Sequence, residues 1–253
     1  MRMARRLWVK GESMGIGETA EKNFQSRLKE NPYPGRGLVI GRPHEDRWVI
    51  LYWIMGRSAN SRNRRFVAEG GSLRTEPVDP ALVKDPSLII YDAMLDLPEV
   101  FLVSNGDQTR TMYETLKKGG TIEEALSGRE REPDAPNFTP RINGMLRISK
   151  SSASAVLAIL KANAFDPAFT DRYYYYPAMP AVGYGLGLTT YSGDGDPLPA
   201  FTGDPLLLPC TGKAEDILEA YWKALHAENR VSLALKEITN RGSKSRILVQ
   251  NRF

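Results

Sequence analysis

The stretch Trp48-Val49-Ile50-Leu51-Tyr52-Trp53-Ile54-Met55 is strongly apolar and predicts a long, buried strand. It runs directly into Gly56-Arg57-Ser58-Ala59-Asn60-Ser61-Arg62-Asn63-Arg64-Arg65. Arginines at the end of a buried strand are held by a rigid scaffold, and a planar guanidinium binds phosphate or carboxylate through two parallel hydrogen bonds. We therefore expect an anion site for a small molecule here. A solvated basic loop is the alternative that this segment alone leaves open.

Short apolar runs bounded by turn residues recur along the rest of the chain. We expect strands at residues 38–40, 66–68, 73–78, 88–93, 100–104, 142–149, 154–162, 173–177, 184–191, 231–238 and 246–249. The alanines of residues 154–162 also favour a helix, but the position of this run between strands decides for a strand. So many short strands indicate a layered sheet protein rather than a helical bundle.

Four segments carry helix signals instead. Residues 107–118 end at Gly119-Gly120, and the capping box Thr121-Ile122-Glu123-Glu124 opens a short helix. Residues 214–228 place their apolar side chains on one face, and residues 20–29 fit a short amphipathic helix.

No internal repeat, low-complexity segment or linker divides the chain, so we expect a single domain at residues 32–253. It begins at the turn cluster Asn31-Pro32-Tyr33-Pro34-Gly35. Residues 1–31 are expected to form a peripheral N-terminal extension.

The composition is that of an ordinary globular protein, with 42% of the 253 residues hydrophobic and 25% charged. No segment approaches the ~18 apolar residues of a membrane helix, and the basic start has too short an apolar part for a secretory signal. The single cysteine, Cys210, excludes an internal disulfide and fits a reducing compartment, so we expect a cytoplasmic protein without membrane contact. Cys210 follows an apolar run and is expected to be buried. His44 and His226 are the only histidines, and they give no zinc-ligand spacing.

The net charge of +4 is unevenly distributed. Residues 1–31 hold 7 of the 34 Lys and Arg and 4 of the 30 Asp and Glu, so the rest of the chain, with 27 and 26, is nearly neutral. A nucleic-acid-binding protein spreads its basic excess over a binding face. Nucleic acid is therefore not an expected partner, and local arginine clusters fit a small anionic ligand better.

Two further segments are candidates for chemistry. Ser104 and Asn105 end a strand before the expected helix, where backbone N–H groups can hold a phosphate or an oxyanion. The alternative is that Asn105 or Asp107 merely caps that helix. Glu132 and Asp134 lie in a proline-stiffened loop, and two neighbouring carboxylates can act as acid and base. A solvated acidic loop is the alternative there.

The tyrosine run at residues 173–176 alternates faces on a strand, so two rings could stack on a purine-like ring or pack in a core or interface. Gly183, Gly185 and Gly187 alternate along a strand and leave room for a close approach. Neither the dinucleotide-binding motif nor a P-loop is present.

Several segments together resemble the archaeal-type IMP cyclohydrolases. In chain order these are Gly35-Arg36-Gly37-Leu38-Val39-Ile40-Gly41-Arg42, Arg57-Ser58 with Arg62, Val103-Ser104-Asn105-Gly106 with Thr109, Thr139-Pro140-Arg141-Ile142, Thr190-Tyr191-Ser192-Gly193-Asp194-Gly195 and Glu228-Asn229-Arg230-Val231-Ser232-Leu233. Each motif alone is weak, and their shared order over about residues 31–240 carries the resemblance.

The resemblance implies a fold like that of the N-terminal nucleophile hydrolases, an α+β, four-layer αββα sandwich of two mostly antiparallel sheets. It also implies an enzyme, a hydrolase acting on cyclic amidines. The reaction would close the purine ring of a formamido-imidazole-carboxamide ribonucleotide to IMP with loss of water, the last step of de novo purine synthesis. The expected partner is this small-molecule nucleotide, and no metal or organic cofactor is expected. The sequence leaves a homo-oligomer open.

The same resemblance implies the site residues. It places the catalytic arginine on Arg62, the tyrosine on Tyr91 and the glutamate on Glu132, with Asp134 as the other match for the carboxylate. The expected contacts to phosphate or ribose are Arg57, Ser104, Asn105 and Arg141.

The chain departs from the family in about thirty additional N-terminal residues. No Cys, Ser or Thr starts the segment at Tyr33, and a terminal-nucleophile mechanism needs one. The resemblance therefore implies the fold of the N-terminal nucleophile hydrolases but not their terminal-nucleophile mechanism. An amide-bond hydrolase with a nucleophile exposed by processing and a non-catalytic purine-nucleotide-binding protein remain the alternatives.

Overall fold

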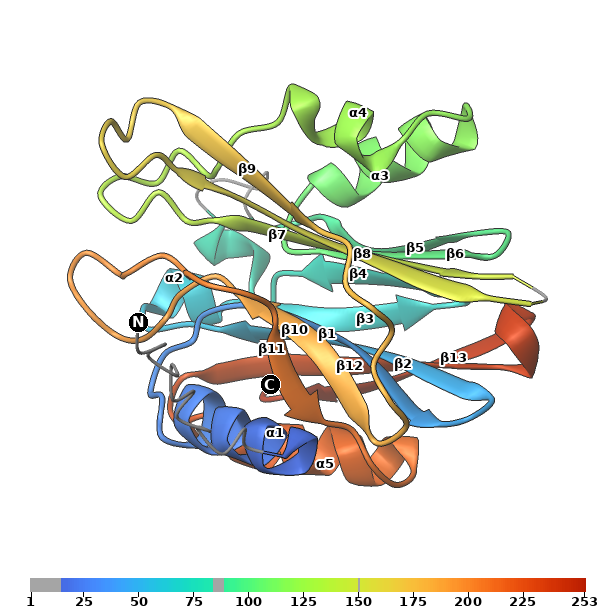
Figure 1. Ribbon diagram of the computed structural model, residues 1–253. Coiled ribbons are helices and arrows are strands. Elements are labelled where there is room, and N and C mark those ends of the chain that lie inside the picture. The colour runs from blue at the N-terminus through green and yellow to red at the C-terminus, as the bar shows by residue number, and fades with distance from the viewer. Residues whose placement is uncertain (1–14, 84–88, 150) are drawn as a thin grey trace, which may run out of the picture.

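The computed structural model describes residues 15–83, 89–149 and 151–253 and contains two antiparallel sheets packed face to face (Figure 1). In spatial order, the six-stranded sheet consists of β11 (Leu206–Pro209), β10 (Tyr184–Thr189), β1 (Gly37–His44), β2 (Arg47–Met55), β12 (Arg230–Thr239) and β13 (Lys244–Asn251). The seven-stranded sheet consists of β3 (Arg65–Glu69), β4 (Ser72–Glu76), β5 (Asp92–Leu97), β6 (Val100–Ser104), β7 (Arg141–Ile148), β8 (Ala153–Ala162) and β9 (Thr170–Tyr175). Every neighbouring pair of strands is antiparallel.

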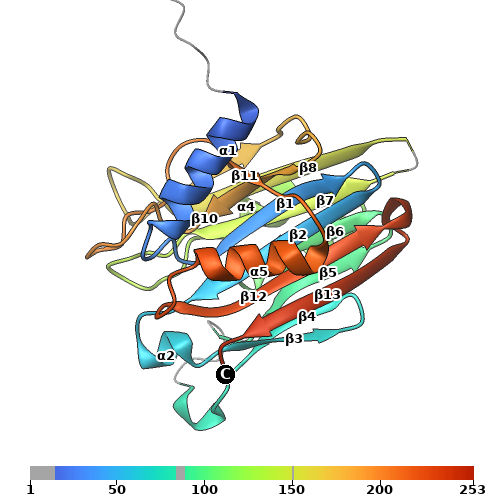
Figure 2. The same cartoon turned by 90° about the horizontal axis from the view of Figure 1, so that it is seen from below.

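Helices cover the outer faces of both sheets. On the six-stranded sheet lie α1 (Ile16–Phe24), which continues into a π-helical turn at Gln25–Lys29, and α5 (Ala214–Ala224) (Figure 2). The seven-stranded sheet carries α3 (Gln108–Lys117) and α4 (Ile122–Ser127). A short helix, α2 (Ala59–Arg62), lies between β2 and β3. The result is an α+β protein with two antiparallel sheets and few helices, as the strand-rich sequence indicated.

The apolar run that follows Arg47 forms β2, as predicted, and every one of its residues from Trp48 to Met55 is buried. The strand lies between β1 and β12 in the sheet, so both of its edges are paired, and its two faces pack against different layers. On one face Trp53 packs near Tyr221 of α5, with 6.4 Å between ring centroids, and on the other Tyr52 packs near Phe66 of β3 at 5.3 Å. A strand covered on both faces needs apolar side chains at successive positions, which explains the unbroken run.

Most of the other predicted elements are confirmed, including the strand preferred over a helix at residues 154–162 and the Thr121 capping box. One prediction needs correction, and one strand was missed. The strand expected at residues 88–93 is β5, which starts later, at Asp92, and Leu88 lies outside the described residues. Tyr91 instead exchanges hydrogen bonds with the backbone and side chain of Thr75, outside the regular ladder. The short strand β11, bounded by prolines, was not expected.

The predicted boundary between residues 31 and 32 stays a prediction. Within residues 15–31, however, Ala20, Phe24 and Leu28 are buried in the main core. The ring of Phe24 meets that of Tyr221 edge to face at 5.1 Å between centroids. The helix α1 and the π-helical turn that follows it are therefore an integral layer of the fold rather than a peripheral extension.

Cys210 is 1% exposed, and burial raises the pKa of its thiol to about 12. A protonated, inaccessible thiol is not a nucleophile, so the expectation of a buried cysteine is confirmed. Among the described residues, no helix has the length and apolar character to span a bilayer.

The two sheets are also joined by a buried lysine. Lys236 of β12 is fully buried, and its ammonium donates to the carbonyl of Gly71 at 2.6 Å and to the Asp96 carboxylate of β5. Burial raises the pKa of Asp96 and lowers that of Lys236, because each charge loses water. The pair is one of the polar links between the two sheets.

Candidate functional site

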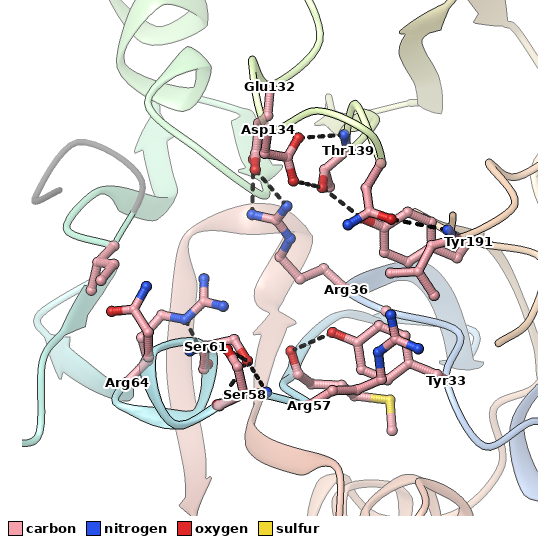
Figure 3. Close-up of a pocket in the computed structure, with 16 residues that line it drawn as sticks. Tyr33, Arg36, Arg57, Ser58, Ser61, Arg64, Glu132, Asp134, Thr139 and Tyr191 are labelled. Atoms are coloured by element: carbon pink, nitrogen blue, oxygen red, sulfur yellow. Dashed lines mark hydrogen bonds and ion pairs between the residues drawn. The ribbon is translucent and has the colours of Figure 1, made fainter. Parts of the chain in front are cut away.

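A cavity of about 380 Å³ opens where the start of β1, the end of β2 and the loop before β7 meet (Figure 3). Its wall is formed by Tyr33, Gly35, Arg36, Met55, Arg57, Ser58, Asn60, Ser61, Arg64, Ile89, Glu132, Asp134, Asn137, Thr139, Tyr191 and Leu198. The wall thus combines three arginines, two carboxylates and two tyrosines. Such a mixture suits an anionic ligand that also carries a flat, hydrogen-bonding part.

The strongest interaction at this cavity joins Arg36 to Glu132. The two guanidinium nitrogens of Arg36 each lie 2.9 Å from a different carboxylate oxygen of Glu132, and both side chains are under 10% exposed. This is a two-point, charge-assisted contact. Burial alone would lower the pKa of Arg36, but Glu132 and the nearby oxygens of Tyr91 and Tyr52 more than offset it, so this pKa is raised well above its ordinary value.

Arg36 precedes β1 in the six-stranded sheet, whereas Glu132 lies in the loop that leads to β7 of the other sheet. The pair therefore fixes the two sheets at the cavity. Gly35, with φ of 72°, is needed next to Arg36, because a Cβ there would lie 2.2 Å from the Thr190 hydroxyl and 2.5 Å from the Tyr191 ring. Glycine thus lets the arginine-bearing turn approach Tyr191 closely.

Ser104, Asn105 and Arg141, expected to contact phosphate or ribose, do not line the cavity. Ser104 and Asn105 are fully buried, and the Asn105 carbonyl accepts a hydrogen bond from Arg36 at 3.1 Å. The Asn105 side chain is in turn held by the backbone of Pro140 and Ile142. Their placement suits a positioning role behind Arg36.

Arg141 is engaged at the start of α3. Its guanidinium donates to the side chains of Asp107 at 2.9 Å and Gln108 at 2.6 Å. Asp107 also pairs with Arg129, and although burial opposes ionisation, these two arginines lower the pKa of Asp107. Asp107 is the N-cap residue of α3, with no side-chain capping bond.

Asp134 is the second carboxylate of the cavity wall. One of its oxygens accepts the Thr139 N–H at 2.7 Å, and the other accepts the Thr139 hydroxyl. The hydroxyl of Thr139 also lies 2.5 Å from that of Tyr191. Phe138 has φ of 42°, a left-handed conformation that turns the chain back so that Thr139 faces Asp134.

Tyr33 and Tyr191 stack at one side of the cavity. Their ring centroids are 6.0 Å apart at 23° between planes, and the Arg57 guanidinium lies 4.9 Å from the centroid of Tyr33. Arg57 is tied to the loop that follows Tyr191 by an ion pair with Asp194 at 2.5 Å. Burial raises the pKa values of Tyr33 and Tyr191, so both phenols are neutral at physiological pH.

Arg62 and Arg64 differ sharply in placement. The Arg62 guanidinium donates to the Gly56 carbonyl at 2.9 Å and to the Asn229 side chain at 3.3 Å, and Arg62 is not part of the cavity wall. Arg64 lines the cavity, is 8% exposed, and donates from Nε to the Ser61 carbonyl at 3.0 Å. Among the described residues, no acceptor is recorded for its terminal N–H groups.

Tyr91 is buried beside the cavity wall rather than within it. Its hydroxyl lies 2.6 Å from that of Tyr52, and both phenols are close enough to influence the charge of Arg36. Burial, and next the neighbouring Tyr91, raise the pKa of Tyr52 well above its ordinary value. Tyr91 is therefore close to Arg36, and its role remains a prediction.

Of the predicted site residues, the cavity brings together Arg57, Glu132 and Asp134. Five further residues line it without a role predicted from the sequence, namely Arg36, Arg64, Thr139, Tyr191 and Tyr33. All five fall in or next to segments that the sequence already marks, namely the arginine stretch and the family-like motifs. Within residues 15–83, 89–149 and 151–253, no three His, Cys, Asp or Glu side chains gather so that they could hold a metal ion.

Fold and cavity define a two-sheet α+β protein with one basic, tyrosine-lined site. The family model of IMP cyclohydrolase-like proteins matches residues 33–242, and the chain belongs to this family. It is 33% identical over 133 residues to an IMP cyclohydrolase of Methanothrix thermoacetophila, covering 50% of this chain and 62% of the relative. It is 28% identical over 115 residues to an IMP cyclohydrolase of Methanopyrus kandleri, covering 44% of this chain and 57% of the relative. The chain therefore matches less than two thirds of the length of either relative.

The buried ion pair makes a testable stability prediction. Glu132→Ala leaves the Arg36 guanidinium buried without a counter-charge, which is expected to lower the free energy of unfolding by about 3–5 kcal/mol. Urea unfolding followed by tryptophan fluorescence measures this. The double variant Arg36→Met with Glu132→Leu should recover part of the loss, since it leaves no unpaired charge. Glu219→Ala, which breaks an exposed pair with Lys223, is the matched control and should change little. A Glu132→Ala variant as stable as the parental chain would contradict the conclusion that Arg36 depends on Glu132 as its buried counter-charge.

Proposed function

We propose that this protein is an IMP cyclohydrolase, which closes the purine ring of 5-formamidoimidazole-4-carboxamide ribonucleotide to IMP with loss of water. Membership of the family and the similarity to two relatives named IMP cyclohydrolase support this reaction. The observation that carries it is the cavity itself, because its wall presents arginine N–H groups, buried tyrosines and the carboxylate of Asp134, which has no cationic partner among the described residues, to one ligand-sized space.

We also propose that the fold is related to that of the N-terminal nucleophile hydrolases. The order helix layer, sheet, sheet, helix layer supports this relation. Tyr33, at the start of the family match, is buried and stacked on Tyr191 within a continuous chain. That arrangement favours cyclisation over terminal-nucleophile hydrolysis, because the latter needs a free terminal Cys, Ser or Thr.

The reaction sets three tasks for the cavity. The carboxamide nitrogen is a poor nucleophile and must be held against the formyl carbon of the same molecule, so orientation supplies much of the acceleration. A proton must leave that nitrogen while negative charge develops on the formyl oxygen. Finally, this oxygen must leave as water. The proposal needs no metal or cofactor for any of these steps.

Arg64 is the group that we assign to the developing negative charge, in place of Arg62. Its terminal N–H groups face the cavity without a recorded acceptor among the described residues. Arg62 instead ties the end of β2 to Asn229 and so positions the turn that presents Arg64. Arg57 keeps its predicted role as a phosphate contact, because it stands at the cavity wall next to Ser58.

Incubation of the purified chain with the formylated ribonucleotide tests the proposed function. Formation of the purine ring changes the ultraviolet absorbance, and chromatography should identify the product as IMP. Tight binding of IMP by calorimetry without ring closure would instead indicate a nucleotide-binding protein. Intact-mass measurement checks the hydrolase alternative, which requires a new Cys, Ser or Thr terminus.

The two arginine assignments can be separated by matched substitutions. Arg64→Gln should lower kcat by about 100-fold or more, because it removes a donor to the transition state. Arg62→Gln should act less, and mainly through stability, since its partners are Gly56 and Asn229. Steady-state kinetics with thermal unfolding of both variants measures this. A larger kcat loss for a folded Arg62→Gln than for Arg64→Gln would restore the assignment made from the sequence.

A further inference from the structure

The cavity wall holds two carboxylates, and only one is available for proton transfer. Both oxygens of Glu132 are occupied by the guanidinium of Arg36, and this pair is buried. A carboxylate held in that way is a poor base, because accepting a proton would leave Arg36 without its counter-charge. Among the described residues, the Asp134 side chain accepts hydrogen bonds from Thr139 alone, through the backbone N–H and the hydroxyl of that threonine.

The hydrogen bonds from Asp134 outward have a defined direction. The Thr139 hydroxyl donates its single proton to the Asp134 carboxylate. That hydroxyl has no second proton, and therefore the Tyr191 hydroxyl, 2.5 Å away, must donate to Thr139. In the part of the chain that the structure describes, no other group donates to the phenol oxygen of Tyr191, so it can accept a proton from a ligand in the cavity. Three groups are thus aligned donor to acceptor, from Tyr191 through Thr139 to Asp134.

We propose that Tyr191, Thr139 and Asp134 form a proton relay, in which Tyr191 is the catalytic residue that contacts the substrate and Asp134 holds the proton in transit. This inference rests on the proposed cyclohydrolase function. It assigns the acid–base role to Asp134 rather than Glu132. Thr139 and Asp134 act through Tyr191.

Proton transfers through the relay account for every proton that moves in the reaction. As the carboxamide nitrogen bonds to the formyl carbon, its proton passes to the Tyr191 oxygen, the Tyr191 proton passes to Thr139, and the Thr139 proton passes to Asp134. The reverse sequence returns a proton to the former formyl oxygen, which becomes a hydroxyl. In the second half, the relay takes the remaining proton of the former formamide nitrogen and delivers it to this hydroxyl. The carbon–oxygen bond then breaks, water leaves, and all three side chains regain their starting states.

The structure holds the relay rigidly. The Tyr191 ring is stacked on Tyr33, and the carbonyl of Thr139 accepts the backbone N–H of Glu132 at 3.0 Å. The Arg36–Glu132 pair thereby anchors the loop that carries Thr139. The Tyr191 phenol and the Thr139 hydroxyl are neutral before and after each transfer. Because an isolated charge is costly to bury, a relay through neutral groups suits this buried position better than a buried ion.

Thr139→Val tests the relay, because valine keeps the shape but removes the hydroxyl that joins Tyr191 to Asp134. We expect kcat for cyclisation to fall about 100-fold with little change in KM. Thr139→Ser should restore most of the rate. Tyr191→Phe, which keeps the stacked ring, should match Thr139→Val, and it gives a second reading if the valine variant does not fold. Two matched controls lie outside the cavity wall and should retain parental kinetics: Thr202→Val, at an exposed threonine, and Tyr175→Phe, at a half-buried tyrosine whose hydroxyl donates to the Gly203 carbonyl.

Rates in mixtures of H2O and D2O give a readout that a merely structural role would not move. The parental rate should depend on the deuterium fraction with the curvature of several protons in flight, and Thr139→Val should lose this curvature. Parental cyclisation with an unchanged kcat in folded Thr139→Val and Tyr191→Phe would overturn the relay alone. A parental chain that binds IMP but does not cyclise the substrate would overturn the proposed function, and the relay with it.

Discussion

The ion pair between Arg36 and Glu132 is the contact on which the site depends. It joins the residue before β1 of one sheet to the loop before β7 of the other, with both side chains under 10% exposed. A buried ion pair stabilises a fold little relative to an apolar contact of similar size. Removing one of its partners is nevertheless strongly destabilising, because the other charge is left buried and unpaired. The Arg36–Glu132 pair is therefore better understood as a device that fixes where the cavity wall stands than as a source of stability.

Once this loop is fixed, the remaining polar groups of the cavity separate into distinct tasks. Glu132 is engaged by Arg36, which leaves Asp134 to exchange protons through Thr139 and Tyr191 in the proposed relay. Arg64 keeps donors directed at the cavity, whereas neighbouring Arg62 bonds to the backbone. Two carboxylates and two arginines close in sequence thus differ in role because their partners differ.

Much of the fold could be predicted, because the pattern and the packing agree. The run after Arg47 is apolar on both faces since β2 is covered on both faces, and the Thr121 capping box fixes the start of α4. The short β11 is a run of three leucines between prolines, and the prolines argue against a strand. At the site, spacing marks the arginine stretch but cannot decide which guanidinium turns inward. Thr139 and Tyr191 are 52 residues apart, and their contact arises only when the sheets pack.

We propose that one nucleotide occupies the space bounded by Arg36, Arg64 and Tyr191. A crystal structure of the chain with IMP, at concentrations that saturate binding, tests this most directly. We expect the purine to lie against the Tyr191 hydroxyl and the phosphate to lie near Arg57. The Arg36–Glu132 pair should remain intact. IMP bound at another place, or an Arg36 guanidinium withdrawn from Glu132 to hold the phosphate, would contradict this proposal.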